Sequence, residues 1–325
     1  MTRRDACTVK AGAARSGENR RKMAQGPDFL VIGAARSGTT FLHTHLRTHP
    51  GLWLPPKKEI YYFSQQSGRG YLNRRQREHI PAFLASLAGA WRHRGAAWRD
   101  LRWGVRYLRG RPSDRWFLSL YPDLPGRRVG QIEPSYANLP DAALGHIARL
   151  LPDLKIVFVM RDPMDRAWSQ ILKRLARQGA RAIGTVPEAA IVAEIERYAA
   201  PMSAYADILD RWQRAFPRTE IHCAFYDALE RDPRAVIDGI ARFLGVGPHP
   251  NLDDDALGRR INHTRAYFEE IPAVHGRRLA ERLLEPTRRL AARFPDPADG
   301  WTRRLETALA TTEDATERTA ACITS

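Results

Sequence analysis

Cysteine, acidic charge and long apolar runs are all scarce in this chain of 325 residues. The three cysteines, Cys7, Cys223 and Cys322, lie far apart and never adopt C-x-x-C spacing, so the sequence indicates neither a disulfide framework nor a zinc site. No apolar run approaches the ~18 residues that a membrane-spanning helix needs, and no apolar stretch follows the charged N-terminus as in a signal peptide. We therefore expect a soluble, cytoplasmic protein without a bound metal.

The shortage of acids leaves a formal net charge of +16, from 52 lysines and arginines against 36 aspartates and glutamates. Such an excess indicates an anionic partner, which could be nucleic acid, a membrane surface or a multiply charged small molecule. The basic residues are spread through the chain, so charge alone does not choose among these partners.

Composition divides the chain into one large domain and two tails. Residues 1–27 are polar and basic without apolar periodicity, which predicts a disordered segment; Met23, near its end, is an alternative start of translation. Residues 28–308 are expected to form the domain, with a helical insertion over about 71–118 that is rich in arginine and tryptophan and lacks strand patterns. Residues 309–325 lose apolar content and are expected to form a loose tail.

Short apolar runs alternate with helical patterns along the domain. Strands are expected at 28–33, 128–132, 155–160 and 220–225, and helices at 39–50, 142–151, 163–178 and 201–215. Strands separated by helices favour a parallel sheet with right-handed crossovers. The predicted fold class is therefore α/β, a three-layer, P-loop-type parallel β-sheet flanked by helices.

The stretch FLVIGAARSGTT, Phe29–Thr40, is typical of a strand that runs into a phosphate-binding loop. The Walker A pattern G-x-x-x-x-G-K-S/T carries a lysine after its second glycine, but here Thr39 occupies that position and Arg36 is the only cation in the loop. Backbone N–H groups at a helix N-terminus bind anions without a lysine. The loop therefore suits a phosphate or a transferring oxyanion, with these candidate ligand-binding residues: Arg36, Ser37, Gly38, Thr39 and Thr40.

A second group of polar residues lies in VFVMRDPMDRAWSQ, Val157–Gln170. Arg161 follows a strand directly, which is where ligand-facing residues lie in open α/β sheets, and Ser169 lies two turns into the next helix. A Walker B strand would end in an aspartate that holds magnesium, and the arginine here argues against a metal-dependent NTPase. Arginine and serine suit a second phosphate, although Arg161 could instead pair with Asp162 or Asp165.

These two segments resemble the signature motifs of the sulfotransferases that use 3′-phosphoadenosine 5′-phosphosulfate (PAPS). In that family the first loop binds the 5′-phosphosulfate, with a basic residue where Arg36 stands, and the second motif binds the 3′-phosphate. LPPKKEIYYFS, Leu54–Ser64, resembles the segment whose glutamate is the proposed catalytic base, which matches Glu59. The resemblance also implies that Tyr226 approaches the adenine and that Arg265 lies near the 3′-phosphate.

The segment GQIEPSYANLP departs from the family's G-E-x-x-P-S-Y pattern. The family's glutamate is Gln131 here, and the lysine that heparan-type enzymes carry next is Ile132. One polar contact is thus missing or is supplied by another residue, for which Glu133 and Lys58 are candidates.

The resemblance implies transfer of a sulfuryl group from PAPS to a hydroxyl or amine of a small-molecule, lipid or carbohydrate acceptor. Arg36 would act electrostatically, since arginine stays protonated, while Glu59 would accept the proton of the acceptor and a neighbouring lysine, Lys57 or Lys58, would keep it ionised.

Several alternatives remain at this point. His43 or His45 could face the cleft, Tyr61 to Phe63 could line an acceptor pocket or belong to the core, and the tryptophans of the insertion could cover an acceptor or merely pack. Two rival functions are a P-loop kinase or NTPase and a basic nucleic-acid-binding protein, the latter because arginines and aromatics alternate over Trp91–Arg111.

Overall fold

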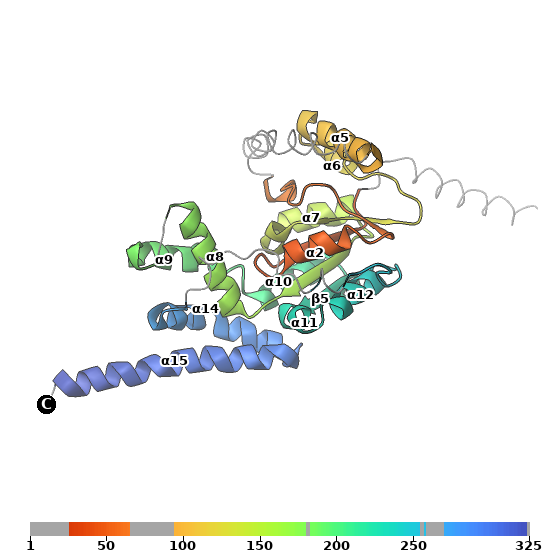
Figure 1. The fold of residues 1–325 in the computed structure, drawn as a ribbon. Coiled ribbons are helices and arrows are strands. Elements are labelled where there is room, and N and C mark those ends of the chain that lie inside the picture. The colour runs from red at the N-terminus through yellow and green to blue at the C-terminus, as the bar shows by residue number, and fades with distance from the viewer. Residues whose placement is uncertain (1–25, 66–93, 180–182, 254–256, 258–269, 324–325) are drawn as a thin grey trace, which may run out of the picture.

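The computed structural model of the protein describes residues 26–65, 94–179, 183–253, 257 and 270–323 (Figure 1). The basic N-terminal segment, the first part of the expected insertion and Arg265 lie outside these residues.

Five parallel strands form the central sheet, in the order β2-β3-β1-β4-β5. Their bounds are Phe29–Gly33 (β1), Leu52–Trp53 (β2), Arg128–Ile132 (β3), Lys155–Met160 (β4) and Ile221–Phe225 (β5). Four of these strands were expected from their apolar runs; β2, with two residues, is too short to give a pattern. The order places β1 between β3 and β4, so the carboxyl ends of these three strands are neighbours.

Alternate residues of the buried strands face opposite sides of the sheet. Leu30 and Ile32 of β1 belong to one apolar cluster, and Phe29 and Val31 of the same strand belong to another. Because both faces are covered, β1 and β4 are almost entirely apolar, as is typical of parallel sheets, whereas β3 also carries the buried polar residue Gln131.

Helices form the two outer layers (Figure 1). α2 (Thr39–Leu46) and α12 (Pro233–Phe243) cover one face, and α7 (Asp141–Leu150) and α10 (Tyr205–Ala215) cover the other. The predicted fold class, a parallel sheet with helices on both faces, is confirmed.

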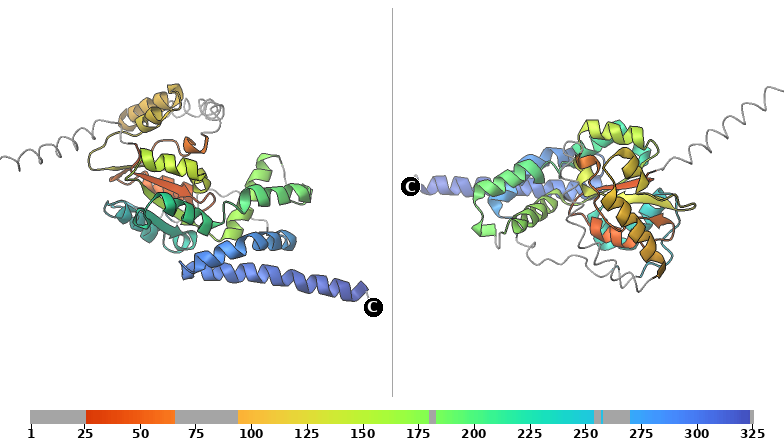
Figure 2. Two further views of the ribbon diagram at one scale, coloured as in Figure 1. Left: turned by 180° about the vertical axis from the view of Figure 1, so that it is seen from behind. Right: turned by 90° about the horizontal axis from the view of Figure 1, so that it is seen from above.

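A third apolar cluster joins the helices that follow β4 to those near the C-terminus. It involves α8 (Pro163–Arg177), α9 (Glu188–Glu194), α14 (Ala273–Ala291) and α15 (Pro295–Ile323). α15 extends far beyond the sheet (Figure 2) and continues to Ile323, where a loose tail was expected. Residues 309–325 contain four alanines and two glutamates, which favour a helix, together with five threonines, which are poorer helix formers.

Two helices, α5 (Arg94–Arg109) and α6 (Asp114–Ser119), lie within the range of the expected insertion. Trp103 and Trp116 are buried, 7% and 5% exposed, so these two tryptophans pack the helices onto the domain. The remaining elements are α11 (Tyr226–Arg231), a π turn at Ile195–Ala199 and 3₁₀ turns at Phe63–Gln65, Pro134–Asn138, Ile183–Thr185 and Arg218–Glu220. Within the described residues, no helix is long and apolar enough to cross a membrane.

Candidate active site

The candidate site is assembled where β1, β3 and β4 end. β1 leads into the loop 34–38, β3 ends beside Glu133, and β4 ends at Arg161. Ligands in open parallel sheets bind beyond the carboxyl ends of the strands, where neighbouring connections diverge to opposite faces. The strand order therefore brings together segments that are about a hundred residues apart in the sequence.

The loop is shaped by two residues in the left-handed region, Arg36 at φ 74° and Gly38 at φ 75°. Gly38 is also the N-cap of α2, and a Cβ there would lie 2.6 Å from Leu229 Cδ2 and 3.3 Å from the Tyr226 ring. Glycine is therefore needed both for the turn and for its close packing. The first N–H groups of α2 have no partner within the helix and are available to an anion.

Ser37 carries an unsatisfied polar group inside the loop. Its side chain is 0% exposed, and its hydroxyl has no hydrogen-bond partner among the described residues. A buried hydroxyl without a partner costs free energy. An anion held by the loop would remove this cost, so the orphaned hydroxyl is a structural sign of a ligand position.

Lys58 supplies the ammonium group that the loop itself lacks. Its Nζ lies 3.1 Å from both Thr39 Oγ1 and Thr40 Oγ1 and donates to these hydroxyls. Thr39 occupies the position of the Walker lysine. The ammonium group of Lys58, which comes from the segment after β2, therefore reaches the loop at this position. Lys58 was expected only to keep Glu59 ionised or to replace a missing polar contact.

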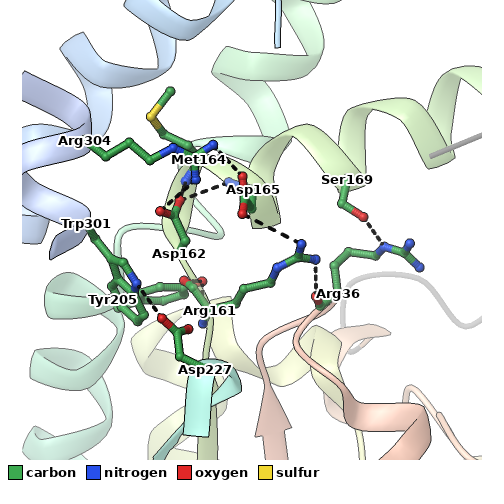
Figure 3. A network of polar contacts seen from close by, with 10 residues as sticks. All are labelled: Arg36, Arg161, Asp162, Met164, Asp165, Ser169, Tyr205, Asp227, Trp301 and Arg304. Atoms are coloured by element: carbon green, nitrogen blue, oxygen red, sulfur yellow. Dashed lines mark hydrogen bonds and ion pairs between the residues drawn. The ribbon is translucent and has the colours of Figure 1, made fainter. Parts of the chain in front are cut away.

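The two predicted anion-binding motifs are joined by hydrogen bonds. Arg36 Nε donates to Ser169 Oγ at 2.9 Å, and Arg161 Nη1 donates to the carbonyl oxygen of Arg36 at 3.3 Å (Figure 3). Residues far apart in the chain, Arg36 in the loop and Ser169 on α8, are thus adjacent, as the two-motif interpretation requires.

Arg161 is held by more than the expected ion pair. Its guanidinium carbon lies 4.9 Å from the centre of the Tyr226 ring, a cation–π contact, and its Nη2 lies 3.9 Å from Asp165 Oδ2. Tyr226, which the resemblance places beside the adenine, lies under this guanidinium, and its contact with the donor stays a prediction. The backbone of Arg161 is fixed by Tyr205, whose hydroxyl donates to the Arg161 carbonyl at 2.9 Å.

Asp162 orients the helix that carries Ser169. Its Oδ1 accepts hydrogen bonds from the backbone N–H groups of Met164 and Asp165, at 2.9 and 3.1 Å, which makes it the N-cap of α8. Arg304 of α15 pairs with Asp162 at 2.9 Å and with Asp165 at 2.8 Å (Figure 3). These charges leave both aspartates engaged by the protein, which fits a structural role better than metal ligation.

The segment that carries Glu59 has an unusual backbone. Glu59 and Tyr61 have φ values of 67° and 62°, a region that residues with a Cβ seldom adopt and that is often found at functional sites. Two contacts hold the segment against the end of β3: Glu59 N–H donates to the Ile132 carbonyl at 3.2 Å, and Tyr61 N–H donates to Glu133 Oε2 at 2.7 Å.

Glu59 is surrounded by groups that stabilise its charge. Burial raises the pKa of its carboxyl, but a short hydrogen bond from the Tyr61 hydroxyl and the charge of Lys58, 3.4 Å away, outweigh this, so the pKa lies below its usual value. Glu59 is therefore ionised at neutral pH and can accept a proton. The expectation that a neighbouring lysine stabilises its charge is met by Lys58, whereas Lys57 turns away to donate to Tyr107 at 2.7 Å.

The departures from the family pattern in β3 are explained by a buried network. Gln131 and Glu133 are both 0% exposed. The Gln131 amide donates to Glu133 Oε2 at 3.3 Å, and Ser135 Oγ donates to Glu133 Oε1 at 2.7 Å. Burial and the charge of Glu59 raise the pKa of Glu133 to about 8, so its carboxyl is largely protonated at neutral pH. Glu133 therefore supports the backbone of the segment that carries Glu59, through its hydrogen bond from the Tyr61 N–H. Glu59, and not Glu133, is the ionised carboxylate.

Lys173 is a site residue that sequence reasoning missed. It follows Ser169 by four residues on α8, so the two share a helix face. Burial and the charges of Arg36 and Arg177 lower the pKa of Lys173 to about 8, and Glu59 and Lys58 are near enough to contribute. In the sequence, the i, i+4 spacing between Ser169 and Lys173 indicates that the two side chains share a helix face.

Other candidates belong to the protein interior. His43 is half-buried, its Nε2 lies 3.4 Å from the Pro55 carbonyl, and burial lowers its pKa to about 4; His45 is 6% exposed. Tyr62 and Phe63 are core residues, 9% and 1% exposed. Tyr61 is half-buried and its hydroxyl donates to Glu59, so a place in the acceptor pocket stays a prediction for Tyr61. No cluster of three metal-ligating side chains occurs in the described part of the chain.

Comparison with known proteins agrees with this geometry. A family model described as "Sulfotransferase family" matches residues 27–250. The chain belongs to the sulfotransferase family. The crystal structure of a sulfotransferase from Alicyclobacillus acidocaldarius superposes with a TM-score of 0.59 at 20% identity, covering 85% of this chain and 98% of that one, which supports the shared fold.

Curated relatives of this sulfotransferase family member include two human proteins. The bifunctional heparan sulfate N-deacetylase/N-sulfotransferase 3 is 24% identical over 244 residues, 70% of this chain and 23% of the relative. The heparan sulfate glucosamine 3-O-sulfotransferase 6 is 24% identical over 242 residues, 71% of this chain and 55% of the relative. The chain thus spans less than a quarter of the first relative and about half of the second.

Proposed function

We propose that this protein transfers a sulfuryl group from 3′-phosphoadenosine 5′-phosphosulfate to a hydroxyl or amine of an acceptor. The observation that carries the proposal is the linked arrangement of Arg36, Ser169 and Arg161 beside the loop. It offers two sets of anion-binding groups on one sheet edge, as a donor with a phosphosulfate and a separate phosphate requires.

The residues present fit this donor. The orphaned hydroxyl of Ser37 and the N–H groups at the start of α2 suit the phosphosulfate, with Lys58 and Arg36 beside them. Arg161 and Ser169 suit the 3′-phosphate. When bound, the donor supplies an activated sulfuryl group whose leaving group is a phosphate.

Transfer breaks the bond between sulfur and the bridging oxygen of the donor and forms a bond from sulfur to the acceptor oxygen or nitrogen. The acceptor proton passes to the Glu59 carboxylate, and the electron pair of the broken bond stays on the departing bisphosphate. Arg36 and Lys58 stabilise the negative charge that develops on the leaving phosphate. Their role is electrostatic, and neither side chain has to transfer a proton.

A carbohydrate is the first acceptor class to test. The two human relatives are named for heparan sulfate, and the enzymes that their names describe modify a sugar amine and a sugar hydroxyl. Small-molecule and lipid acceptors belong in the same screen.

The kinase or NTPase alternative is disfavoured by the same geometry. Arg161 stands where a Walker B aspartate would end β4, and Asp162 and Asp165 are engaged with Arg304 and the start of α8. Magnesium therefore has no available carboxylate at the end of this strand.

Calorimetric titration with 3′-phosphoadenosine 5′-phosphate, in parallel with ATP and magnesium, tests the proposal. We expect metal-independent binding of the bisphosphate that is weakened about 10- to 100-fold in Arg161→Ala and Arg36→Ala, because each substitution removes a charge-assisted hydrogen-bond donor. Arg303→Ala, an exposed arginine on α15, is the matched control and should bind as the unaltered protein does. Preferential, magnesium-dependent binding of ATP would overturn the proposal.

A further inference from the structure

An open groove lies between α5 and α6, on the outer side of the molecule. It has a volume of about 830 Å³ and is lined by Leu101, Arg102, Val105, Arg106, Arg109, Gly110, Ser113, Arg115, Trp116 and Ser119. Both views place these helices at the end of the molecule opposite α14 and α15 (Figures 1 and 2). The proposed sulfuryl transfer makes no use of this groove.

The groove has an uncompensated positive rim. The stretch 94–119 contains seven arginines and two aspartates. Both aspartates are engaged: Asp100 pairs with Arg47 at 2.8 Å, and Asp114 accepts a hydrogen bond from Tyr62 at 2.7 Å and lies 3.0 Å from His146.

Three of the four rim arginines, Arg102, Arg109 and Arg115, are exposed and make no ion pair or side-chain hydrogen bond with the residues that the structure describes. The fourth, Arg106, donates to the Ser119 carbonyl at 2.7 Å. The rim therefore carries charge that the described residues do not neutralise.

The floor of the groove is apolar and rigid. Val105 is 39% exposed, one of three large apolar side chains exposed to this degree among the described residues, and it lies next to Leu101 one helical turn before it. The opposite side of α5 is fixed to the domain: Trp103 Nε1 donates to the Leu120 carbonyl at 2.9 Å, and Trp116 Nε1 donates to the Arg106 carbonyl at 3.2 Å. The groove thus exists before any partner arrives.

The burial of the aromatic side chains described on α5 and α6 favours one kind of anionic partner for this surface. Proteins that bind single-stranded nucleic acid stack bases on exposed aromatic rings, but Trp103, Tyr107 and Trp116 are 7%, 2% and 5% exposed. The exposed apolar side chain between the arginines is the aliphatic Val105. Cationic side chains around exposed aliphatic ones are typical of helices that lie at the interface of an anionic bilayer.

We propose that the α5–α6 groove docks this protein onto a lipid surface that carries anionic headgroups. The unpaired arginines contact the headgroup phosphates, and Val105 and Leu101 face the boundary with the acyl chains. The docking is peripheral and needs no membrane-spanning segment.

Sedimentation of the full chain with vesicles tests this proposal. Vesicles of phosphatidylcholine alone are compared with an equimolar mixture of phosphatidylcholine and phosphatidylglycerol, at low and at physiological salt. We expect binding to the mixed vesicles only, weakened by salt. The variant Arg102→Gln/Arg109→Gln/Arg115→Gln should lose about 100-fold in partitioning, since each basic residue near an anionic surface contributes about five-fold.

The matched control removes three exposed arginines from other elements, as Arg218→Gln/Arg242→Gln/Arg303→Gln. It has the same net charge as the groove variant and should retain most of the binding. Val105→Asp should weaken binding, whereas Val105→Leu should preserve it. Thermal unfolding of each variant verifies that the fold is intact, independently of the proposed enzymatic function.

Three results would overturn the proposal. Equal binding to neutral vesicles would show that anionic headgroups are not recognised. Equal losses in the groove and control variants would show that only net charge matters. Binding of a single-stranded oligonucleotide that depends on the three groove arginines, without binding to mixed vesicles, would make the groove a nucleic-acid site.

Discussion

Lys58→Met tests whether a lysine from another segment supplies the cation that the loop lacks. The substitution keeps a long apolar side chain of similar length and removes only the ammonium group. In the structure this group lies 3.1 Å from two hydroxyls of the loop and 3.4 Å from Glu59. Its loss should weaken binding of 3′-phosphoadenosine 5′-phosphate, because the bound anion would face the charge of Glu59 with less compensation.

The expected size of the effect follows from the position of Lys58. Its side chain is 18% exposed, so solvent screens its charge less than that of a surface lysine. A hydrogen bond to a charged group in such a place contributes about 1.5–3 kcal/mol, which corresponds to roughly 10- to 100-fold in the dissociation constant. The pKa of Glu59 should also rise, because Lys58 is one of the groups that lowers it.

Lys57→Met is the matched control for this experiment. It removes the same charge one residue away, but Lys57 Nζ donates to Tyr107 and lies 4.6 Å from the centre of that ring, turned away from the loop. Calorimetric titration should show a change of about two-fold or less for this variant. Equal losses in the two variants, or unchanged binding in Lys58→Met, would refute the assignment of Lys58 to the anion site.

Three further predictions concern the loop and the network below it. Gly38→Ala should destabilise the protein by about 1–3 kcal/mol in urea unfolding, because an alanine at φ 75° is strained and its Cβ would lie 2.6 Å from Leu229; unchanged stability would contradict the geometry of the turn. Ser169→Ala should weaken bisphosphate binding about ten-fold, since it removes a phosphate ligand and frees Arg36 Nε, and binding equal to that of the unaltered protein would contradict this. Burial raises the pKa of Glu133 from an ordinary value of 4.5 to about 8, so the stability that its protonated form contributes is complete below pH 4.5 and is lost as the pH rises to 8. Glu133→Gln cannot ionise and should not show this loss. Parallel pH profiles of the unfolding free energy for the two proteins would refute the raised pKa.

Much of the fold could be predicted from local patterns. The runs in β1 and β4 are apolar over five residues, those in β3 and β5 are partly apolar, and helical periodicity lies between them, which is sufficient to indicate a parallel sheet with covered faces. β2 has two residues and no pattern. Helix ends were displaced by a few residues, as with α2, which stops at Leu46 rather than Pro50. Beyond residue 309 a low apolar content was taken as a tail, although alanine-rich polar sequence can also form a helix.

The candidate site was only partly predictable. The loop residues and Arg161 could be named because each follows a strand, and Glu59 because its segment resembles a known motif. Glu133 was foreseen only as a replacement contact, and Lys173 was not foreseen. Their roles depend on which groups surround them, and those groups come from distant parts of the chain.

The sequence by itself determined that the loop after β1 suits an anion. A glycine turn between a strand and a helix, with an arginine and three hydroxyls, is a local arrangement, and local backbone geometry suffices to present anion-binding groups. Tertiary structure alone decided the rest, because charges act through space: the strand order brings Lys58 to the loop, places Arg36 against Ser169, and buries Glu133 beneath Glu59, so that one carboxyl is protonated and the other ionised. The rim of arginines on α5 and α6 likewise became visible only in the folded protein, where Asp100 pairs with Arg47, Asp114 accepts a hydrogen bond from Tyr62, and Trp103, Tyr107 and Trp116 are buried.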